Sequence, residues 1–199
     1  REYLAITGKL NWQQFTLSEI LENHEMLSNE IATKIKPVKE FKDYLVIGYY
    51  PFFMEYRDTY HQRLEQVINL VLENDITALK PVSLEGVKKL KQLLYILSTS
   101  VPFKPNISKL SERTNISRNS LVQYLHYLNE AEILNLLFRN TSGISLLQKP
   151  EKIYFENSNL AYTLGFENTE TGNLRETFFI NQISGKHQIN YTDNEIGRA

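Results

Sequence analysis

Two groups of polar residues have the types and positions that chemistry on nucleic acids requires. Arg118, Asn119 and Gln123 stand at the start of a predicted helix that follows a short polar turn. Arginine, asparagine and glutamine side chains can pair with base edges in the major groove of DNA, and the second helix of a helix-turn-helix presents such residues to that groove. The three residues are therefore candidates for contact with DNA.

The second group is Arg175 and Glu176, at the start of a predicted C-terminal helix. Nucleases of the restriction-endonuclease type place one carboxylate on an early helix and further Asp, Glu and Lys residues on the following hairpin, which together hold a divalent metal. Glu176 stands where the first carboxylate is expected, and the others would lie beyond Ala199. Since an exposed charge pair is the commoner role for such residues, we predict no complete catalytic site and no metal site.

The sequence lacks the residues that other common catalytic and cofactor-binding sites require. The chain has no cysteine, which excludes disulfides and thiolate metal ligands, and its four histidines lie too far apart in sequence for a zinc site. The eight glycines form neither a phosphate-binding loop nor a dinucleotide-binding motif. No segment resembles a nucleophile elbow, so a Ser-His-Asp triad is not indicated. We expect no cofactor to bind within these residues.

The charge of the chain argues against tight binding to DNA. The 22 Lys and Arg nearly balance the 23 Asp and Glu, for a net charge of -1, so no global field draws the chain to nucleic acid or to an anionic membrane. Arg118 is the one Lys or Arg between residues 118 and 132, which also contain Glu130 and Glu132. Phosphate contacts supply most of the non-specific affinity for DNA. A protein partner is therefore expected more than DNA.

The sequence also bears on location. Its longest apolar runs, residues 45–54 and 133–138, are far shorter than the roughly 20 residues that span a bilayer. Residues 1–4 lack both a starting Met and a signal-peptide pattern, so we interpret the chain as the continuation of a longer N-terminal sequence. The absence of cysteine fits a reducing compartment. We expect a cytoplasmic protein with no membrane partner.

The first part of the chain, up to Pro81, is predicted to be entirely helical. One helix begins with Ser18 as its capping residue, and another begins at Pro37 and ends at Gly48, where glycine tolerates left-handed backbone. A third helix has an apolar face at helical spacing. That face comprises Tyr60, Leu64, Val67, Ile68, Val71 and Leu72.

Three helices and a hairpin are predicted next. The first has a core-facing stripe that comprises Leu84, Val87, Leu90, Leu94 and Leu97. Asn106 caps the second helix, and Ser117 caps the third, on which Leu121, Leu125 and Leu128 share one face. Two strand-like runs, 133–139 and 144–155, come next and are joined by a glycine-containing turn at 140–143. Helix, turn, helix and hairpin together predict a winged helix-turn-helix.

Short elements complete the chain. Residues 157–164 are predicted to form a short helix, 167–173 a polar turn, and 174–183 a further helix. Residues 188–191 resemble the first strand of a further element. The fold class is therefore mainly α, with β structure confined to the hairpin and to the C-terminal segment after residue 183.

Several strings resemble, in order and over almost the whole chain, a bacterial and archaeal family of AAA-type ATPases. They are residues 1–4 (REYL), 18–24 (SEILENH), 44–45 (YL), 48–51 (GYYP), 73–76 (ENDI), 106–110 (NISKL) with Ser117 and 124–125 (YL), 149–154 (KPEKIY) and 172–179 (GNLRETFF). The resemblance implies that an ATPase core, which binds ATP and magnesium, lies upstream in the same polypeptide.

The resemblance also implies three regions. Residues 1–82 would form a helical lid and connector, 83–155 the winged helix-turn-helix, and 156–199 the beginning of a truncated, restriction-endonuclease-like α/β domain. The chain would then be a non-catalytic C-terminal region that couples the ATPase core to a partner through the winged helix. The alternatives are a DNA-binding winged-helix regulator and part of a metal-dependent nuclease.

Overall fold

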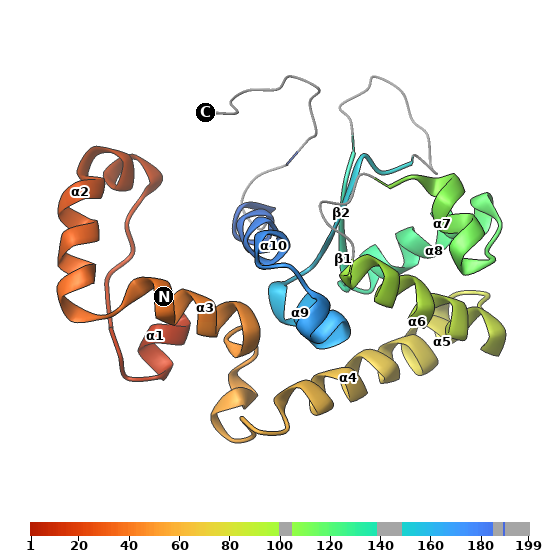
Figure 1. Ribbon diagram of the computed structural model, residues 1–199, viewed down its shortest axis with the longest axis horizontal. Helices are drawn as coiled ribbons and strands as arrows, with labels where there is room; N and C mark the ends of the chain where they lie inside the picture. Colours follow the sequence, from red (N-terminus) through yellow and green to blue (C-terminus); the bar gives the residue numbers. More distant parts are fainter. Residues whose placement is uncertain (100–104, 139–148, 185–188, 190–199) are drawn as a thin grey trace. The chain divides into compact units, whose positions relative to one another are not determined.

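The computed structural model describes residues 1–99, 105–138, 149–184 and 189 (Figure 1). These residues are mainly helical and contain a two-stranded antiparallel sheet, as the sequence predicts for the fold class. The chain divides into two compact units, Arg1–His61 and Gln62–Ala199. The domain boundary predicted between residues 82 and 83 falls inside the second unit. None of the helices in the described ranges has both the length and the apolar character needed to cross a membrane.

The first unit contains three helices and a 3-10 turn. They are α1 (Glu2–Ile6), α2 (Leu17–Lys34), α3 (Pro37–Ile47) and η1 (Pro51–Met54). Helix α3 begins at Pro37 as predicted, but the predicted cap of α2, Ser18, is wrong. Thr16 caps α2, because its hydroxyl accepts the Glu19 N–H while the Glu19 carboxylate accepts the Thr16 N–H. Ser18 has no acidic residue three positions later that could close such a capping box.

Gly48 ends α3 for a different reason from the predicted one. Its φ is −96°, so left-handed backbone is not what requires glycine. A Cβ at Gly48 would instead lie 2.4 Å from Tyr44 Cδ2 and 2.9 Å from Tyr3 Cδ2. The glycine therefore permits a close approach to the aromatic core of this unit.

That core is built from aromatic rings. Tyr3 contacts Tyr44 and Phe53 at centroid distances of 5.5 and 5.4 Å, and Phe52 stacks on Tyr60 at 4.8 Å. Burial raises the pKa of the Tyr44 hydroxyl to about 12 and raises that of Tyr60 as well. The apolar residues of α2 contribute little to this core, because most of them are exposed. The exposed ones are Leu17, Ile20, Leu21 and Met26.

The second unit holds the remaining elements, with α4 starting two residues before it. They are α4 (Tyr60–Leu70), η2 (Val71–Asp75), α5 (Ile76–Leu79), α6 (Leu84–Ser98), α7 (Ile107–Thr114), α8 (Arg118–Glu130), β1 (Leu134–Leu137), β2 (Lys152–Phe155), α9 (Ser158–Gly165), η3 (Phe166–Asn168) and α10 (Thr171–Ser184). The element η2 is a π-helical turn, and η3 is a 3-10 turn.

The π-helical turn η2 can be explained by the spacing of apolar residues around it. Leu64, Ile68, Leu72 and Ile76 are all buried and recur every four residues. Since an α-helix has 3.6 residues per turn, a four-residue repeat rotates away from the core by about 40° at each step. Hydrogen bonds that span five residues, as in a π turn, offset this rotation. Leu72 and Ile76 therefore both remain on the buried side of the helix.

Helices α6, α7 and α8 pack as their sequence patterns predict. The Asn106 side chain accepts the Lys109 N–H, and the Ser117 hydroxyl accepts the Ser120 N–H, which confirms both caps. The predicted buried face of α8 is confirmed, with all three leucines at 0% exposure, and Asn119 and Gln123 are exposed as expected. One member of the α6 stripe departs from the prediction, because Leu84 is 85% exposed in the first turn of that helix.

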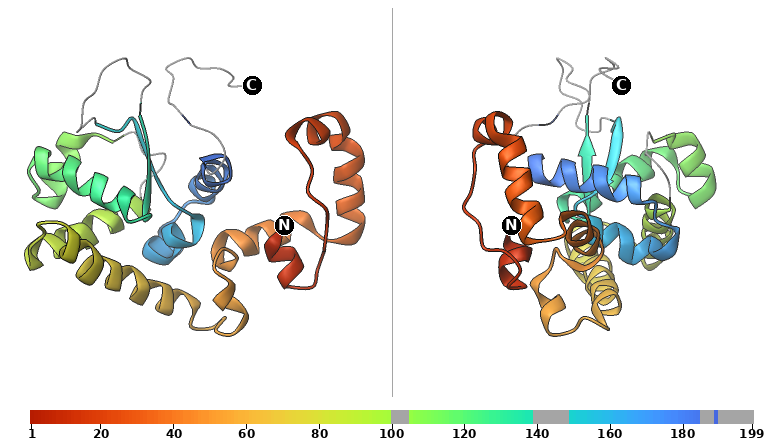
Figure 2. Two further views of the ribbon diagram at one scale, coloured as in Figure 1. Left: turned by 180° about the vertical axis from the view of Figure 1, so that it is seen from behind. Right: turned by 60° about the vertical axis from the view of Figure 1, so that its left-hand side comes forward.

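Strands β1 and β2 pair in an antiparallel register that runs from Leu134 opposite Phe155 to Leu137 opposite Lys152. The views in Figures 1 and 2 agree that the strand pair lies between α8 and α10. The predicted turn at 140–143 lies outside the described residues, and so does nearly all of the strand predicted at 188–191.

Helices α9 and α10 differ from the prediction at their adjoining ends. The predicted polar turn at 167–173 is partly helical, because η3 comes directly after α9 and α10 begins at Thr171, three residues before its expected start. Asn157 caps α9 by accepting the N–H groups of Asn159 and Leu160. Gly165 ends α9 where a Cβ would lie 3.0 Å from the Ser98 carbonyl oxygen, so α9 approaches the end of α6 closely.

Candidate functional site

The exposed N-terminal end of α8 carries the residues predicted to contact DNA. Arg118 and Asn119 are exposed, and neither side chain has a hydrogen bond or ion pair with another described residue. Gln123 lies one turn further along, and its amide donates to the Tyr127 hydroxyl. The structure therefore leaves Arg118 and Asn119 available to a partner and holds Gln123 against its own helix.

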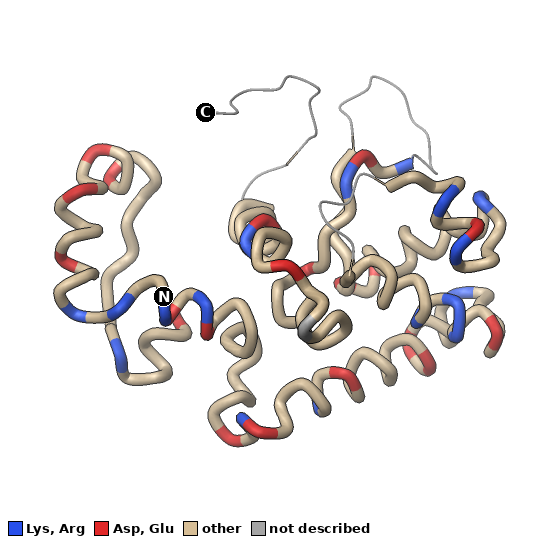
Figure 3. Tube along the Cα trace, viewed as in Figure 1, with Lys and Arg blue, Asp and Glu red and all other residues tan. Residues whose placement is uncertain are grey.

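Few cations surround this end of α8. Lys109 and Arg113 are exposed on α7, with Glu112 between them in sequence. Figure 3 shows that basic and acidic residues are interspersed along the described chain. The turn passes through Asn115, whose φ of 52° is left-handed. Lys104, a further cation that precedes α7 in the sequence, lies outside the described residues. With Arg118, the described part of this end offers three cations and one carboxylate.

The C-terminal part of α8 is fixed to the end of α5. Lys80 Nζ lies 2.5 Å from Glu130 Oε2 and 5.1 Å from the centroid of the Tyr127 ring. Because Tyr127 also receives the Gln123 amide, these contacts form one network along the second half of the helix. Arg118 and Asn119, in the first turn of α8, take no part in this network.

Glu176 belongs to a polar seam between β2 and α10, which we define as Lys152, Tyr154, Glu156, Glu176 and Asn181. Alternate residues of β2 and its continuation face α10, as strand geometry requires. The Tyr154 hydroxyl donates to Glu176 Oε2 at 3.1 Å, and Lys152 Nζ lies 3.8 Å from the same oxygen. The Asn181 amide donates to Glu156 Oε1 at 3.2 Å. The polar seam thus attaches α10 to the sheet.

The residues around Glu176 favour a structural role for its carboxylate over metal binding. Its neighbours are a lysine and a tyrosine, which neutralise and orient the carboxylate, rather than a second carboxylate that could share a metal ion. Among the residues that the structure describes, no group of three His, Asp or Glu side chains could hold a metal. These contacts support a role for Glu176 in attaching α10 to β2.

Glu156, another member of the polar seam, lies in an environment that disfavours its charged form. Burial raises the pKa of its carboxyl above 4.5, and the nearby Glu132 acts in the same direction. Hydrogen bonds from Asn181 and Asn135 lower the pKa and only partly offset burial. The carboxylate form of Glu156 is therefore less favourable in the folded chain than in water.

We expect Glu156→Gln to reduce the pH dependence of stability. A carboxyl with a raised pKa binds its proton more tightly when folded, so this contribution to stability is lost as pH rises from 4.5 through the folded pKa. Glutamine keeps an oxygen that accepts from Asn181 but does not titrate. Urea unfolding at a series of pH values should show a smaller decline for the variant than for wild type. Glu112→Gln, which changes an exposed carboxyl, is the control and should leave the pH profile of stability as in wild type. Identical pH profiles for wild type and Glu156→Gln would contradict the raised pKa of Glu156.

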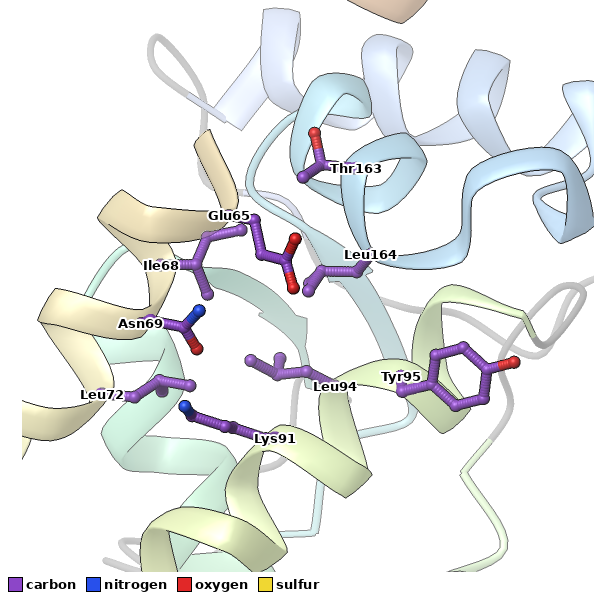
Figure 4. A pocket seen from close by; sticks show the side chains of 9 residues that line it. All are labelled: Glu65, Ile68, Asn69, Leu72, Lys91, Leu94, Tyr95, Thr163 and Leu164. Carbon is purple, nitrogen blue, oxygen red and sulfur yellow. The ribbon is translucent and has the colours of Figure 1, made fainter. Parts of the chain in front are cut away.

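A small pocket, which the sequence did not indicate, lies between α4 with η2, α6 and α9. Its volume is 170 Å³ (Figure 4). It is lined by Glu65, Ile68, Asn69, Leu72, Lys91, Leu94, Tyr95, Thr163 and Leu164. These residues come from three separate segments, so no local motif could have identified them. The helical spacing of the polar residues along α4 was the one available signal, and it is shared by any exposed helix face.

Comparison with known proteins places this chain in a family. It is similar to MJ1637, an uncharacterized protein of Methanocaldococcus jannaschii, with 22% identity over 78% of this chain and 34% of that protein. The chain thus spans about a third of the length of that relative. No solved structure matches it. A family model described as Domain of unknown function (DUF8612) matches residues 38–171, which include α8 and the pocket. Because this match covers more than half of its length, the chain belongs to the family Domain of unknown function (DUF8612).

Proposed function

We propose that the chain is the non-catalytic C-terminal region of an AAA-family ATPase and couples an upstream ATPase core to a protein partner through a winged helix. The winged helix would consist of α6, α7, α8, β1 and β2. ATP and magnesium would bind in the upstream core. Residues from 156 onward would form the beginning of a nuclease-like domain. Glu176 would be a remnant of the metal-binding carboxylates of such a domain.

The ordered strings that resemble the ATPase family support this proposal, as does the order of elements in the second unit. Three helices followed by two antiparallel strands is the order of a winged helix. The observation that carries the partner assignment is the first turn of α8, where Arg118 and Asn119 are exposed and without a partner in the described chain. Such free polar side chains on a rigid helix suit recognition of a macromolecule.

The charges at this surface favour a protein over DNA. Specific DNA binding normally neutralises several phosphates, whereas the described end of α8 and α7 has three cations beside Glu112. Protein interfaces, in contrast, are often rich in arginine and need no excess of positive charge. A protein partner with a modest acidic or polar surface is therefore the better match.

The proposal predicts that nucleotide acts on α8 only through the upstream core. In the full-length gene product, adding ATP and magnesium should change hydrogen exchange at residues 118–123, whereas ATP without magnesium should not. The isolated chain should give no binding heat with ATP in calorimetry, because it has no phosphate-binding loop. Micromolar binding of ATP by the isolated chain, or unchanged exchange in the full-length protein, would refute the coupling role.

DNA binding is the second candidate function, since Lys109, Arg113 and Arg118 are exposed cations on the consecutive helices α7 and α8. We expect fluorescence anisotropy with a random-sequence duplex to detect no submicromolar complex. Three phosphate contacts would give a slope of log affinity against log salt of about −2.7. Tighter binding that falls steeply with salt and is lost in Arg118→Ala, but not in Lys88→Ala on α6, would favour the DNA-binding function.

A further inference from the structure

We propose that the pocket between α4, α6 and α9 binds a primary alkylammonium group, supplied by a free aliphatic amine or by a lysine side chain of a polypeptide. This assignment is independent of the proposed role of α8. It depends on the charge, the apolar floor and the size of the pocket.

The charges around the pocket favour a cation. Glu65 and Lys91 are the two charged residues that line it. Lys91 Nζ already pairs with Glu73 Oε1 at 2.6 Å, whereas the Glu65 carboxylate has no ion pair or hydrogen bond with the described residues. The three groups together carry a net charge of -1. The uncompensated charge at the pocket is therefore negative.

The positions of the side chains support the same conclusion. Figure 4 shows the Glu65 carboxylate directed across the pocket toward Leu164, while Lys91 Nζ points toward Asn69 and Leu72. Asn69 lies one helical turn after Glu65 and also lacks a side-chain hydrogen bond within the described chain. Its amide oxygen can accept from an ammonium group that the Glu65 carboxylate attracts. An ammonium has three donors and matches two such acceptors.

The floor of the pocket accommodates an alkyl chain. It consists of four aliphatic side chains from the three segments, namely Ile68, Leu72, Leu94 and Leu164. Lysine side chains and aliphatic amines place methylene groups on apolar surface while the ammonium remains near polar groups and water. The volume of 170 Å³ is below that of most drug-sized sites, so it fits one unbranched side chain rather than a cofactor.

The π-helical turn gives this pocket its shape. Leu72 and Glu73 both lie in η2, so this turn supplies part of the floor and also the partner that neutralises Lys91. In a regular α-helix, residues 72 and 73 would be rotated relative to Ile68, and the pair with Lys91 would be displaced. Single π turns within helices are frequent at functional sites. Here the turn supplies the carboxylate of Glu73, which pairs with Lys91.

The test is titration of the isotopically labelled chain, monitored by NMR, with 1,4-diaminobutane and with Nα-acetyl-lysine-N-methylamide. Saturable shifts at the amides of the lining residues are expected with at least one amine. Binding by the lysine derivative alone indicates a polypeptide source, and binding by the diamine alone indicates a free ligand. Pentanoate, which has the opposite charge on a similar chain, should not bind. Absence of saturation with both amines would overturn the proposal.

Three variants distinguish a specific site from general attraction of cations. Glu65→Gln should weaken binding about tenfold, because it removes a charge-assisted hydrogen bond. Glu73→Gln should also weaken it, although Glu73 does not line the pocket, because Lys91 would lose its counter-charge. Glu112→Gln on α7 removes the same charge elsewhere and should leave the affinity unchanged. Equal affinity of wild type and Glu65→Gln, or equal loss in all three variants, would exclude this site.

Discussion

Replacing Leu125 with alanine should lower the free energy of unfolding by about 2–5 kcal/mol, the range for fully buried leucines. The Leu125 side chain is 0% exposed, between Leu121 and Leu128 on the buried face of α8. The alanine variant loses the transfer free energy of the removed carbons and leaves a cavity that close-packed neighbours fill only in part. Urea unfolding monitored by far-UV circular dichroism would measure the loss.

Leu84→Ala is the matched control for this substitution. Leu84 is also a helical leucine that the sequence pattern assigns to a core-facing stripe, but it is 85% exposed. Its replacement should change stability by less than about 0.5 kcal/mol, as is usual at exposed positions. A similar loss for both variants would mean that α6 and α8 are packed differently from this structure. Fluorescence of Trp12, the single tryptophan, would report separately on the first unit.

Gly165→Ala is expected to cost about 1–3 kcal/mol, the usual range for overpacking in a core. An added Cβ would lie 2.2 Å from Thr169 Oγ1 and 3.0 Å from the Ser98 carbonyl oxygen. Thr169 can rotate only by giving up its hydrogen bond to the Ala161 carbonyl, and the Ser98 backbone moves only with the end of α6. The same urea titration would measure the change, which should appear as a lower midpoint.

The control for this variant is Gly172→Ala in α10. A Cβ at Gly172 would meet no heavy atom within 4 Å. Alanine is favoured over glycine within helices by about 0.5–1 kcal/mol, so this variant should be as stable as wild type or more so. Opposite signs at the two glycines are expected. Equal, small effects would show that α9 and α6 are further apart than their contact at Gly165 indicates.

The elements that the sequence predicted correctly are those with local signals. Asn106 and Ser117 cap helices because their side chains accept backbone N–H groups three residues away, which a short window of sequence contains. The spacing of the leucines likewise predicts the buried face of α8. Asn119 and Gln123 lie off this leucine face, so they were predicted to be exposed, and this is confirmed.

Features that depend on contacts between distant segments were missed. An added Cβ at Gly165 would contact Ser98 as well as Thr169, and one at Gly48 would contact Tyr3 as well as Tyr44. Ser98 and Tyr3 are distant in sequence, so these two contacts have no local signal. The pocket combines Glu65, Lys91 and Thr163, which no motif links. Leu84 was predicted to be buried but is exposed. Periodicity identifies the apolar face of α6, but it does not indicate whether another element covers the first turn of that helix. These are tertiary effects, which override local patterns.

The attachment of α10 through the polar seam has a consequence for how the chain opens. Leu174 and Thr177 are the buried residues of this 14-residue helix, and the buried Thr177 hydroxyl has no hydrogen-bond partner in the described chain. Hydrogen bonds and ion pairs at such a surface exchange readily for water, so they resist separation less than apolar packing does. Detachment of α10 is therefore expected to cost less free energy than global unfolding of the second unit.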